Sequence, residues 1–115
     1  MRIAFAAEGE GINAKLAYHF GRCPYYVFVD LDTNSIKNTT TKENPFFNTH
    51  EEGAVPQFIA TEKVDILIAG GMGPKAIEWF NKLKITAITT KPREISNVLK
   101  DYLAGKLSGA KSCRT

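Results

Sequence analysis

The sequence places an imidazole, a guanidinium and a thiol within one short segment, residues 19–24. His19 and Cys23 carry the nitrogen and sulfur donors that metal–sulfur clusters accept, and Arg22 offers several N–H donors to an anion. Gly21 lets a ligand approach the backbone closely. The same segment would also suit a structural loop, in which Cys23 is a small buried hydrophobe and His19 satisfies a backbone carbonyl. A His-x-x-x-Cys spacing does not by itself define a zinc site, which needs four ligands.

A glycine-rich segment, residues 70–76, follows an apolar run and precedes a run with helical spacing. The N–H groups at the start of a helix favour an anion, and Lys75 adds positive charge, so Gly71, Met72 and Gly73 join the candidate site. The alternative is a tight turn that needs glycine for a positive φ. The segment matches a dinucleotide fingerprint, yet no acidic residue ends the next predicted strand, and its lysine is not at the Walker A spacing. We therefore expect no bound nucleotide.

A second histidine, His50, stands ahead of a predicted helix and is either a helix cap or a ligand. Thr49 and Glu52 have the spacing of a capping box. Glu51 and Glu52 are most simply carboxylates of the first helical turn, where the helix dipole favours negative charge, and they give no acid–base pair. The candidate metal ligands are therefore His19, Cys23 and His50.

The composition favours a binding role over catalysis. The chain has no G-x-S-x-G, C-x-x-C or carboxylate cluster, and no nucleophile has a base close to it in sequence. The formal net charge of +3 comes from 15 basic and 12 acidic residues without a Lys/Arg block, so nucleic acid is not an expected partner. The apolar run before Glu8 is too short for a signal peptide or a membrane span. We expect a cytoplasmic protein without membrane contact, with Cys23 and Cys113 as free thiols.

The segments that must position these residues alternate between strand-like and helix-like patterns. We expect strands at 2–7, 25–31, 35–42, 64–69 and 85–89, and helices that begin near Gly53, at Pro74 and at Pro92, the last ending at Gly105. The strand at 35–42 is polar and should be an edge. The order β-β-β-α-β-α-β-α implies an α/β fold with a five-stranded mixed β-sheet and three α-helices. We expect one domain over 1–107 and a mobile polar tail at 108–115.

Taken together, these segments resemble the dinitrogenase iron-molybdenum cofactor biosynthesis family. The similarity rests on an ordered set that spans almost the whole chain: His19-Phe20-Gly21-Arg22, Asn44-Pro45, His50-x-x-Gly53-Ala54, Gly71-x-Gly73-x-Lys75-Ala76 and Tyr102-Leu103-x-Gly105-Lys106-Leu107. It implies a ribonuclease H-like fold and binding of the iron-molybdenum cofactor, its precursor or a related metal–sulfur cluster. Members act as carriers or escorts, which implies other cofactor-assembly proteins as partners. Orange proteins, a close variant that holds a molybdenum–copper sulfide cluster, fit equally well.

The resemblance also implies how a cluster would be held. Sulfide-bridged clusters are usually anionic, so Arg22, Lys75 and helix-end N–H groups would bind one electrostatically. His19, His50 or Cys23 would supply a direct or indirect contact, and the three segments should converge at one edge of the sheet. Two alternatives stay open. One is an interaction or regulatory module that binds no cluster, and the other is a small enzyme that uses Cys23, whose thiol pKa would then be lowered.

Overall fold

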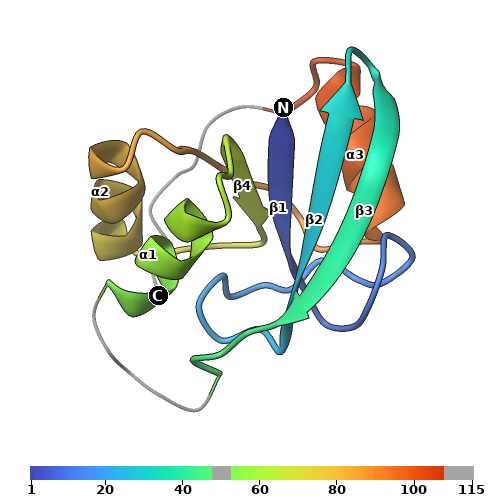
Figure 1. Cartoon of the computed structure of the whole chain (residues 1–115). Coiled ribbons are helices and arrows are strands. Elements are labelled where there is room, and N and C mark those ends of the chain that lie inside the picture. The colour runs from blue at the N-terminus through green and yellow to red at the C-terminus, as the bar shows by residue number, and fades with distance from the viewer. Residues whose placement is uncertain (48–52, 108–115) are drawn as a thin grey trace.

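A computed structural model describes residues 1–47 and 53–107. Its elements are β1 (Arg2–Ala7), β2 (Tyr25–Asp32), β3 (Ser35–Glu43), α1 (Ala54–Thr61), β4 (Ile66–Ala69), α2 (Pro74–Lys82), β5 (Thr86–Thr89) and α3 (Ile95–Leu103). The five strands form one mixed sheet in the order β3-β2-β1-β4-β5 (Figure 1). The predicted element order and the mixed α/β fold are confirmed.

The register of the sheet brings several loops to one end. β1 pairs antiparallel with β2 and parallel with β4, and β5 continues the parallel half. Ala7 lies opposite Tyr25, and Tyr25 lies opposite Glu43. The carboxyl ends of β1, β4 and β5 therefore share an edge with the start of β2 and the end of β3. The loops that follow β1, β3 and β4 all leave the sheet there, which is where parallel sheets place their ligands.

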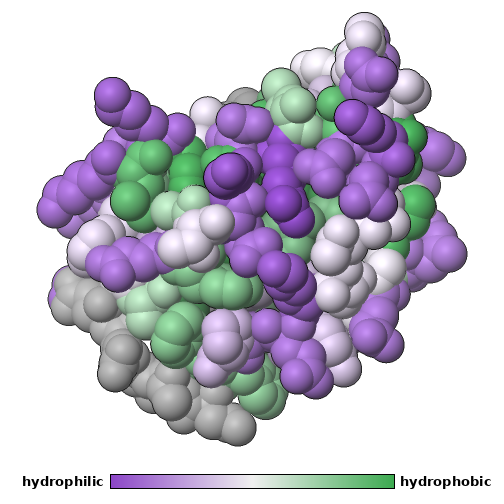
Figure 2. All heavy atoms as spheres, viewed as in Figure 1, coloured by the Kyte–Doolittle hydropathy of each residue, from purple (hydrophilic) through white to green (hydrophobic). Residues whose placement is uncertain are grey.

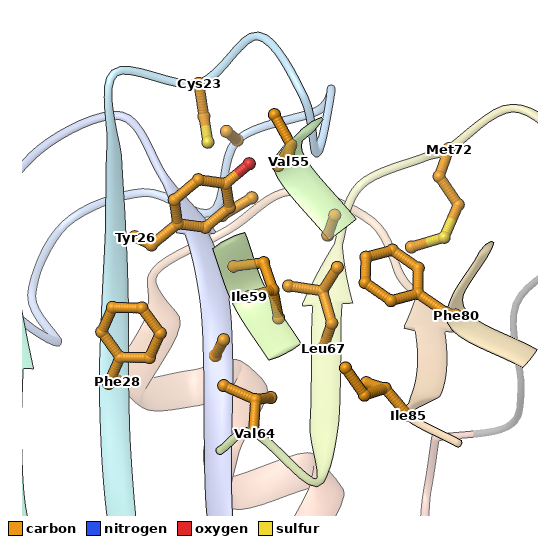
Figure 3. Close-up of a cluster of buried hydrophobic side chains, with 14 residues drawn as sticks. Cys23, Tyr26, Phe28, Val55, Ile59, Val64, Leu67, Met72, Phe80 and Ile85 are labelled. Atoms are coloured by element: carbon orange, nitrogen blue, oxygen red, sulfur yellow. The ribbon is translucent and has the colours of Figure 1, made fainter. Parts of the chain in front are cut away.

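The central strands are apolar on both faces because helices cover both. One face, with Ala4, Tyr26, Phe28 and Leu67, packs against α1 and α2 (Figures 1 and 3). The other face, with Ile3, Phe5, Val27, Val29 and Ile68, packs against Ile95, Val98 and Leu99 of α3. Successive residues of a strand point to opposite faces, so a strand between two helical layers must be apolar throughout.

β3 is the polar edge that its composition predicts. Most of its side chains are exposed, and three consecutive threonines occupy its middle. In Figure 2 polar side chains cover much of the visible surface, and hydrophobic side chains form separate patches at the upper left, at the right and in the lower part of the view. Phe47, which follows the strand in the loop toward α1, is 49% exposed. A polar edge strand discourages pairing with another chain.

α3 begins three residues later than its sequence predicts, so the expectation of a start at Pro92 is wrong. The N–H groups of Ile95 and Ser96 donate to the carbonyls of Ala14 and Ile12, both at 2.9 Å. The loop after β1 thus satisfies N–H groups that every helix start leaves unpaired, and it holds the preceding residues extended. Glu94 is the cap residue of this helix.

The C-terminus of α3 follows the prediction. Gly105 has φ of 74°. Its N–H donates to the Tyr102 carbonyl at 3.0 Å, and that of Lys106 donates to the Asp101 carbonyl at 2.9 Å. These two bonds make a Schellman motif, for which glycine is the favoured residue.

α1 begins at Ala54, after Gly53 with φ of 80°, and Pro56 lies in its first turn as predicted. The predicted capping box at 49–52 lies outside the described residues. Within 1–47 and 53–107, no helix is long and apolar enough to cross a bilayer.

Candidate functional site

Two of the three candidate loops are joined through their backbones. His19 forms a parallel bridge with Gly71. The Phe20 N–H donates to the Gly71 carbonyl at 3.3 Å, and the Gly70 N–H donates to the Ala17 carbonyl at 2.9 Å. The segment at 17–20 therefore extends the end of β4 as a short added strand. The predicted convergence of the His19 and Gly71 loops is confirmed.

Gly70 makes this contact possible, and this role of Gly70 was not predicted from the sequence. A β-carbon on Gly70 would lie 2.6 Å from the Tyr18 Cα and 2.9 Å from Pro92 Cγ. None of the glycines at 70–73 has a positive φ, so the alternative of a turn that needs left-handed glycines is wrong. Gly70 serves close approach instead. The doubled glycine after a buried strand was the available signal.

Cys23 lies in the core with its side chain 1% exposed. Its Sγ donates to the Phe20 carbonyl at 3.4 Å and points toward the hydroxyl of Tyr26 (Figure 3). Burial raises the pKa of the Cys23 thiol from 9.0 to about 11, and contacts with Tyr26 and backbone N–H groups offset only part of that rise. The thiol is therefore protonated at neutral pH. An enzyme that uses Cys23 would need a lowered thiol pKa, whereas the pKa of this thiol is raised.

Tyr26 and Asn44 both form hydrogen bonds to backbone carbonyls of the same loop. The Tyr26 hydroxyl donates to the Phe20 carbonyl, and its ring is fully buried. Asn44 is 5% exposed, and its Nδ2 donates to the carbonyls of Gly21, at 3.3 Å, and Cys23, at 2.9 Å. The start of the loop that leads to His50 is thereby fixed beside residues 20–23. Neither residue was among the candidates, although Asn44 was part of the motif set.

The polar side chains among the described candidates face solvent. His19, Arg22 and Lys75 are all exposed. The ring of Tyr18 packs edge-on against the His19 imidazole, with 4.8 Å between centroids. Within the part of the chain that the structure describes, no carboxylate forms an ion pair with Arg22. Among the described residues, the Arg22 guanidinium therefore stands beside the joined loops without a carboxylate partner.

The remaining candidates contribute backbone rather than side chains. Met72 is 3% exposed, and its thioether packs near Phe80 in the core (Figure 3). Gly73 is the extended residue directly ahead of α2, with φ of −76°. A β-carbon on Gly21 or Gly73 would meet no atom of residues 1–47 or 53–107 within 4 Å, so both residues border space that the described part of the chain leaves open.

His50 lies outside the described residues, and its place in the site stays a prediction. The described flanks, Asn44 to Phe47 and Gly53, lie on the loop that leaves β3 at the site edge. Among the residues that the structure describes, no group of three His, Cys, Asp or Glu side chains could hold a metal ion. A fully protein-ligated metal is thus not formed by those residues alone.

Two open hollows bounded by described residues lie away from these loops. One, of about 390 Å³, is bounded by Met1, Leu31 and Tyr102 at the opposite end of the sheet. None of the candidate residues borders it. We place the site at the joined loops because the charge and the free backbone groups are there.

Comparison with known proteins gives the family. The family model described as "Dinitrogenase iron-molybdenum cofactor" matches residues 1–105. An uncharacterized protein of Methanocaldococcus jannaschii is 34% identical over 109 residues, which cover 93% of this chain and 89% of that protein.

Solved structures agree with the fold. The crystal structure of PH0822 has a TM-score of 0.84 and 38% identity, covering 95% of this chain and 96% of that one. The apo form of the orange protein from Desulfovibrio gigas has a TM-score of 0.87 and 25% identity, covering 99% of this chain and 96% of that one. Because the family model matches residues 1–105, the chain belongs to the dinitrogenase iron-molybdenum cofactor family.

Proposed function

We propose that the protein is a cytoplasmic carrier that binds an anionic metal–sulfur cluster as cargo during cofactor assembly or trafficking and does no chemistry on it. The cargo would be the iron-molybdenum cofactor, its precursor or a related cluster such as a molybdenum–copper sulfide. The observation that carries the proposal is the backbone bridge between His19 and Gly71, which sets the Arg22 loop beside the start of α2. Family membership supports the class of cargo.

The electrostatics fit an anionic cargo. Arg22 on the loop and Lys75 in the first turn of α2 are exposed cations, and the N–H groups at the start of α2 carry partial positive charge. An anion held by charge and N–H donors can be released again, whereas a permanent iron–sulfur centre needs several cysteine ligands. The described residues hold one cysteine, and it is buried. This balance favours a carrier over an electron-transfer protein.

The three proposed metal ligands differ in how readily they could act. His19 is exposed and would need no rearrangement. Cys23 would have to lose its proton and leave the core, which its raised thiol pKa opposes. We therefore assign direct contact to His19 first, keep His50 as a further candidate, and give Cys23 mainly a supporting place in the loop.

A carrier must also meet the proteins that load and unload it. Tyr18 is 47% exposed and Phe47 is 49% exposed, and both belong to loops at the site edge of the sheet. Aromatic residues of this kind are enriched where proteins associate. We propose that cofactor-assembly proteins dock here. The same two residues would serve a regulatory module that carries no cluster, which is the alternative function.

Analysis of the purified protein tests the proposal. The full chain would be purified without oxygen and assayed for iron, molybdenum, copper and acid-labile sulfide, with an Arg22→Ala variant prepared in parallel. We expect sulfide together with at least one of the metals in the wild type and less of both in the variant. A folded wild-type protein that neither retains these elements nor takes up a thiometallate anion contradicts the carrier function and leaves the module.

A further inference from the structure

The loop that carries Arg22 has its carbonyl groups directed into the protein. The Phe20 carbonyl accepts from the Tyr26 hydroxyl and the Cys23 thiol. The Gly21 carbonyl accepts from Asn44 Nδ2 at 3.3 Å. Both carbonyls are thus held by side chains that lie below the surface. Buried donors of this kind are rarely left unpaired, so each fixes the peptide group that it contacts.

The orientation of a carbonyl determines that of the next N–H. The described residues contain no cis peptide bond, and in a trans peptide the C=O and N–H groups point in opposite directions. With the Phe20 and Gly21 carbonyls directed inward, the N–H groups of Gly21 and Arg22 are directed outward. Neither N–H donates to an acceptor among the described residues. Two consecutive donors therefore face the open side of the loop, next to the Arg22 side chain.

Asn44 has little freedom to release the loop. Its Oδ1 accepts from the Phe46 N–H at 2.9 Å, and its own N–H donates to the Pro24 carbonyl at 2.9 Å. Its Nδ2 spans two carbonyls of the same loop, those of Gly21 and Cys23. Every polar group of this buried residue forms a hydrogen bond, so the side chain connects the two loops in one fixed orientation.

We propose that Tyr26 and Asn44 are positioning residues that hold the Gly21 and Arg22 N–H groups toward the cargo, which makes this loop a second row of anion donors in addition to the start of α2. The inference rests on the proposed carrier function and adds its recognition chemistry. The cargo is then recognised by backbone N–H groups, which do not depend on the type of side chain. It is a compact sulfide-bridged or oxo-bridged anion that offers several acceptors at once.

The test uses tetrathiomolybdate as the probe, because this dianion absorbs visible light and is diamagnetic. The full-length protein labelled with ¹⁵N would be titrated without oxygen, following the amide signals of Gly21, Arg22 and Lys75. Tyr26→Phe removes one hydroxyl, and Tyr25→Phe is its matched control, because Tyr25 packs on the opposite face of the same strand. Asn44→Ala is paired with Asn97→Ala, at an exposed position of α3.

We expect the Gly21 and Arg22 amide protons to shift on binding in the wild type. Tyr26→Phe should raise the dissociation constant about fivefold and Asn44→Ala about tenfold. In both variants the shifts of the Gly21 and Arg22 amide protons should be smaller, and the shift of the Lys75 amide should be retained. Both control variants should match the wild type. Probe binding that moves the Lys75 amide but not those of Gly21 and Arg22 overturns this inference and leaves the carrier function standing.

Amide hydrogen exchange gives a second test that needs no ligand. Outward-facing Gly21 and Arg22 amides should exchange rapidly in the free protein, while the neighbouring Phe20 amide, bonded to Gly71, should be protected. Slow exchange at Gly21 and Arg22 would show that their N–H groups face inward and would overturn the inference. A wild type that binds no probe overturns the inference, and it overturns the carrier function as well when the anaerobically purified protein also retains no metal or sulfide.

Discussion

Gly70 lies so close to Tyr18 that a β-carbon on Gly70 would stand 2.6 Å from the Tyr18 Cα. This approach joins the end of β4 to the loop that carries the exposed His19 and Arg22. It is the contact that couples the sheet to the candidate site.

Gly70→Ala should therefore loosen the site as well as the fold. The added methyl must displace backbone, so we expect a loss of about 1–3 kcal/mol in the free energy of unfolding, measured with urea. Gly73→Ala is the control, because its β-carbon would meet open space at an ordinary φ of −76°. Equal stability of the two variants would show that Tyr18 and Gly70 do not touch in solution.

Gly53→Ala should be the more damaging of two substitutions at left-handed glycines. Gly53 has φ of +80°, and its β-carbon would lie 2.5 Å from the Trp79 ring, whereas Gly105 has φ of +74° and open space around it. We expect about 1 kcal/mol of destabilisation for Gly105→Ala from backbone strain and about 3 kcal/mol for Gly53→Ala from strain and overlap. Thermal unfolding of both variants checks the order.

Gly21→Ala should separate stability from binding. Its β-carbon would contact no atom of the described residues within 4 Å, so the unfolding free energy should stay within about 0.5 kcal/mol of the wild type. A cargo that touches the Gly21 backbone would meet the new methyl group, and uptake of tetrathiomolybdate should fall several-fold. Unchanged uptake would place the cargo away from this loop.

The Cys23 thiol should resist alkylation at about pH 8, since burial raises its pKa to about 11. In a Cys113→Ser background, iodoacetamide should label the native protein far more slowly than the urea-unfolded protein. The unfolded thiol ionises first, near pH 9.0, so stability contributed by the protonated folded thiol should be present below that pH and lost as the pH rises toward about 11. Rapid native labelling would contradict the buried position.

The elements that periodicity defines were predictable from the sequence. β1 matches residues 2–7, the hairpin pairs as expected, and α2 begins at Pro74. The start of α3 was not predictable, because it depends on carbonyls of Ala14 and Ile12, about 80 residues earlier in the chain. Local signals such as proline describe a helix start only where the neighbouring loop leaves it free.

The exposed polar residues of the site were predictable from the sequence, whereas the buried residues that hold its loops in place were not. His19, Arg22 and Lys75 could be named from residue type, and the structure leaves them exposed. The burial of Cys23 could not be told from the alternative of a reactive thiol, because a segment of six residues does not reveal which side meets the core. Tyr26 and Asn44 act through contacts across strands and loops, which one sequence does not display.

The central claim is that the cargo is an anion held by Arg22 and backbone donors. Anaerobic titration of tetrathiomolybdate into the wild type, Arg22→Ala and Lys75→Arg, at about 50 mM and about 500 mM salt, tests it most directly. Arg22→Ala should weaken binding about tenfold, because a multi-donor cation is lost, while Lys75→Arg keeps its charge and should stay within about twofold. High salt should weaken binding in the wild type. Binding that is indifferent to salt and to Arg22→Ala, but abolished by Cys23→Ser, would contradict the account and show a thiolate-ligated metal instead.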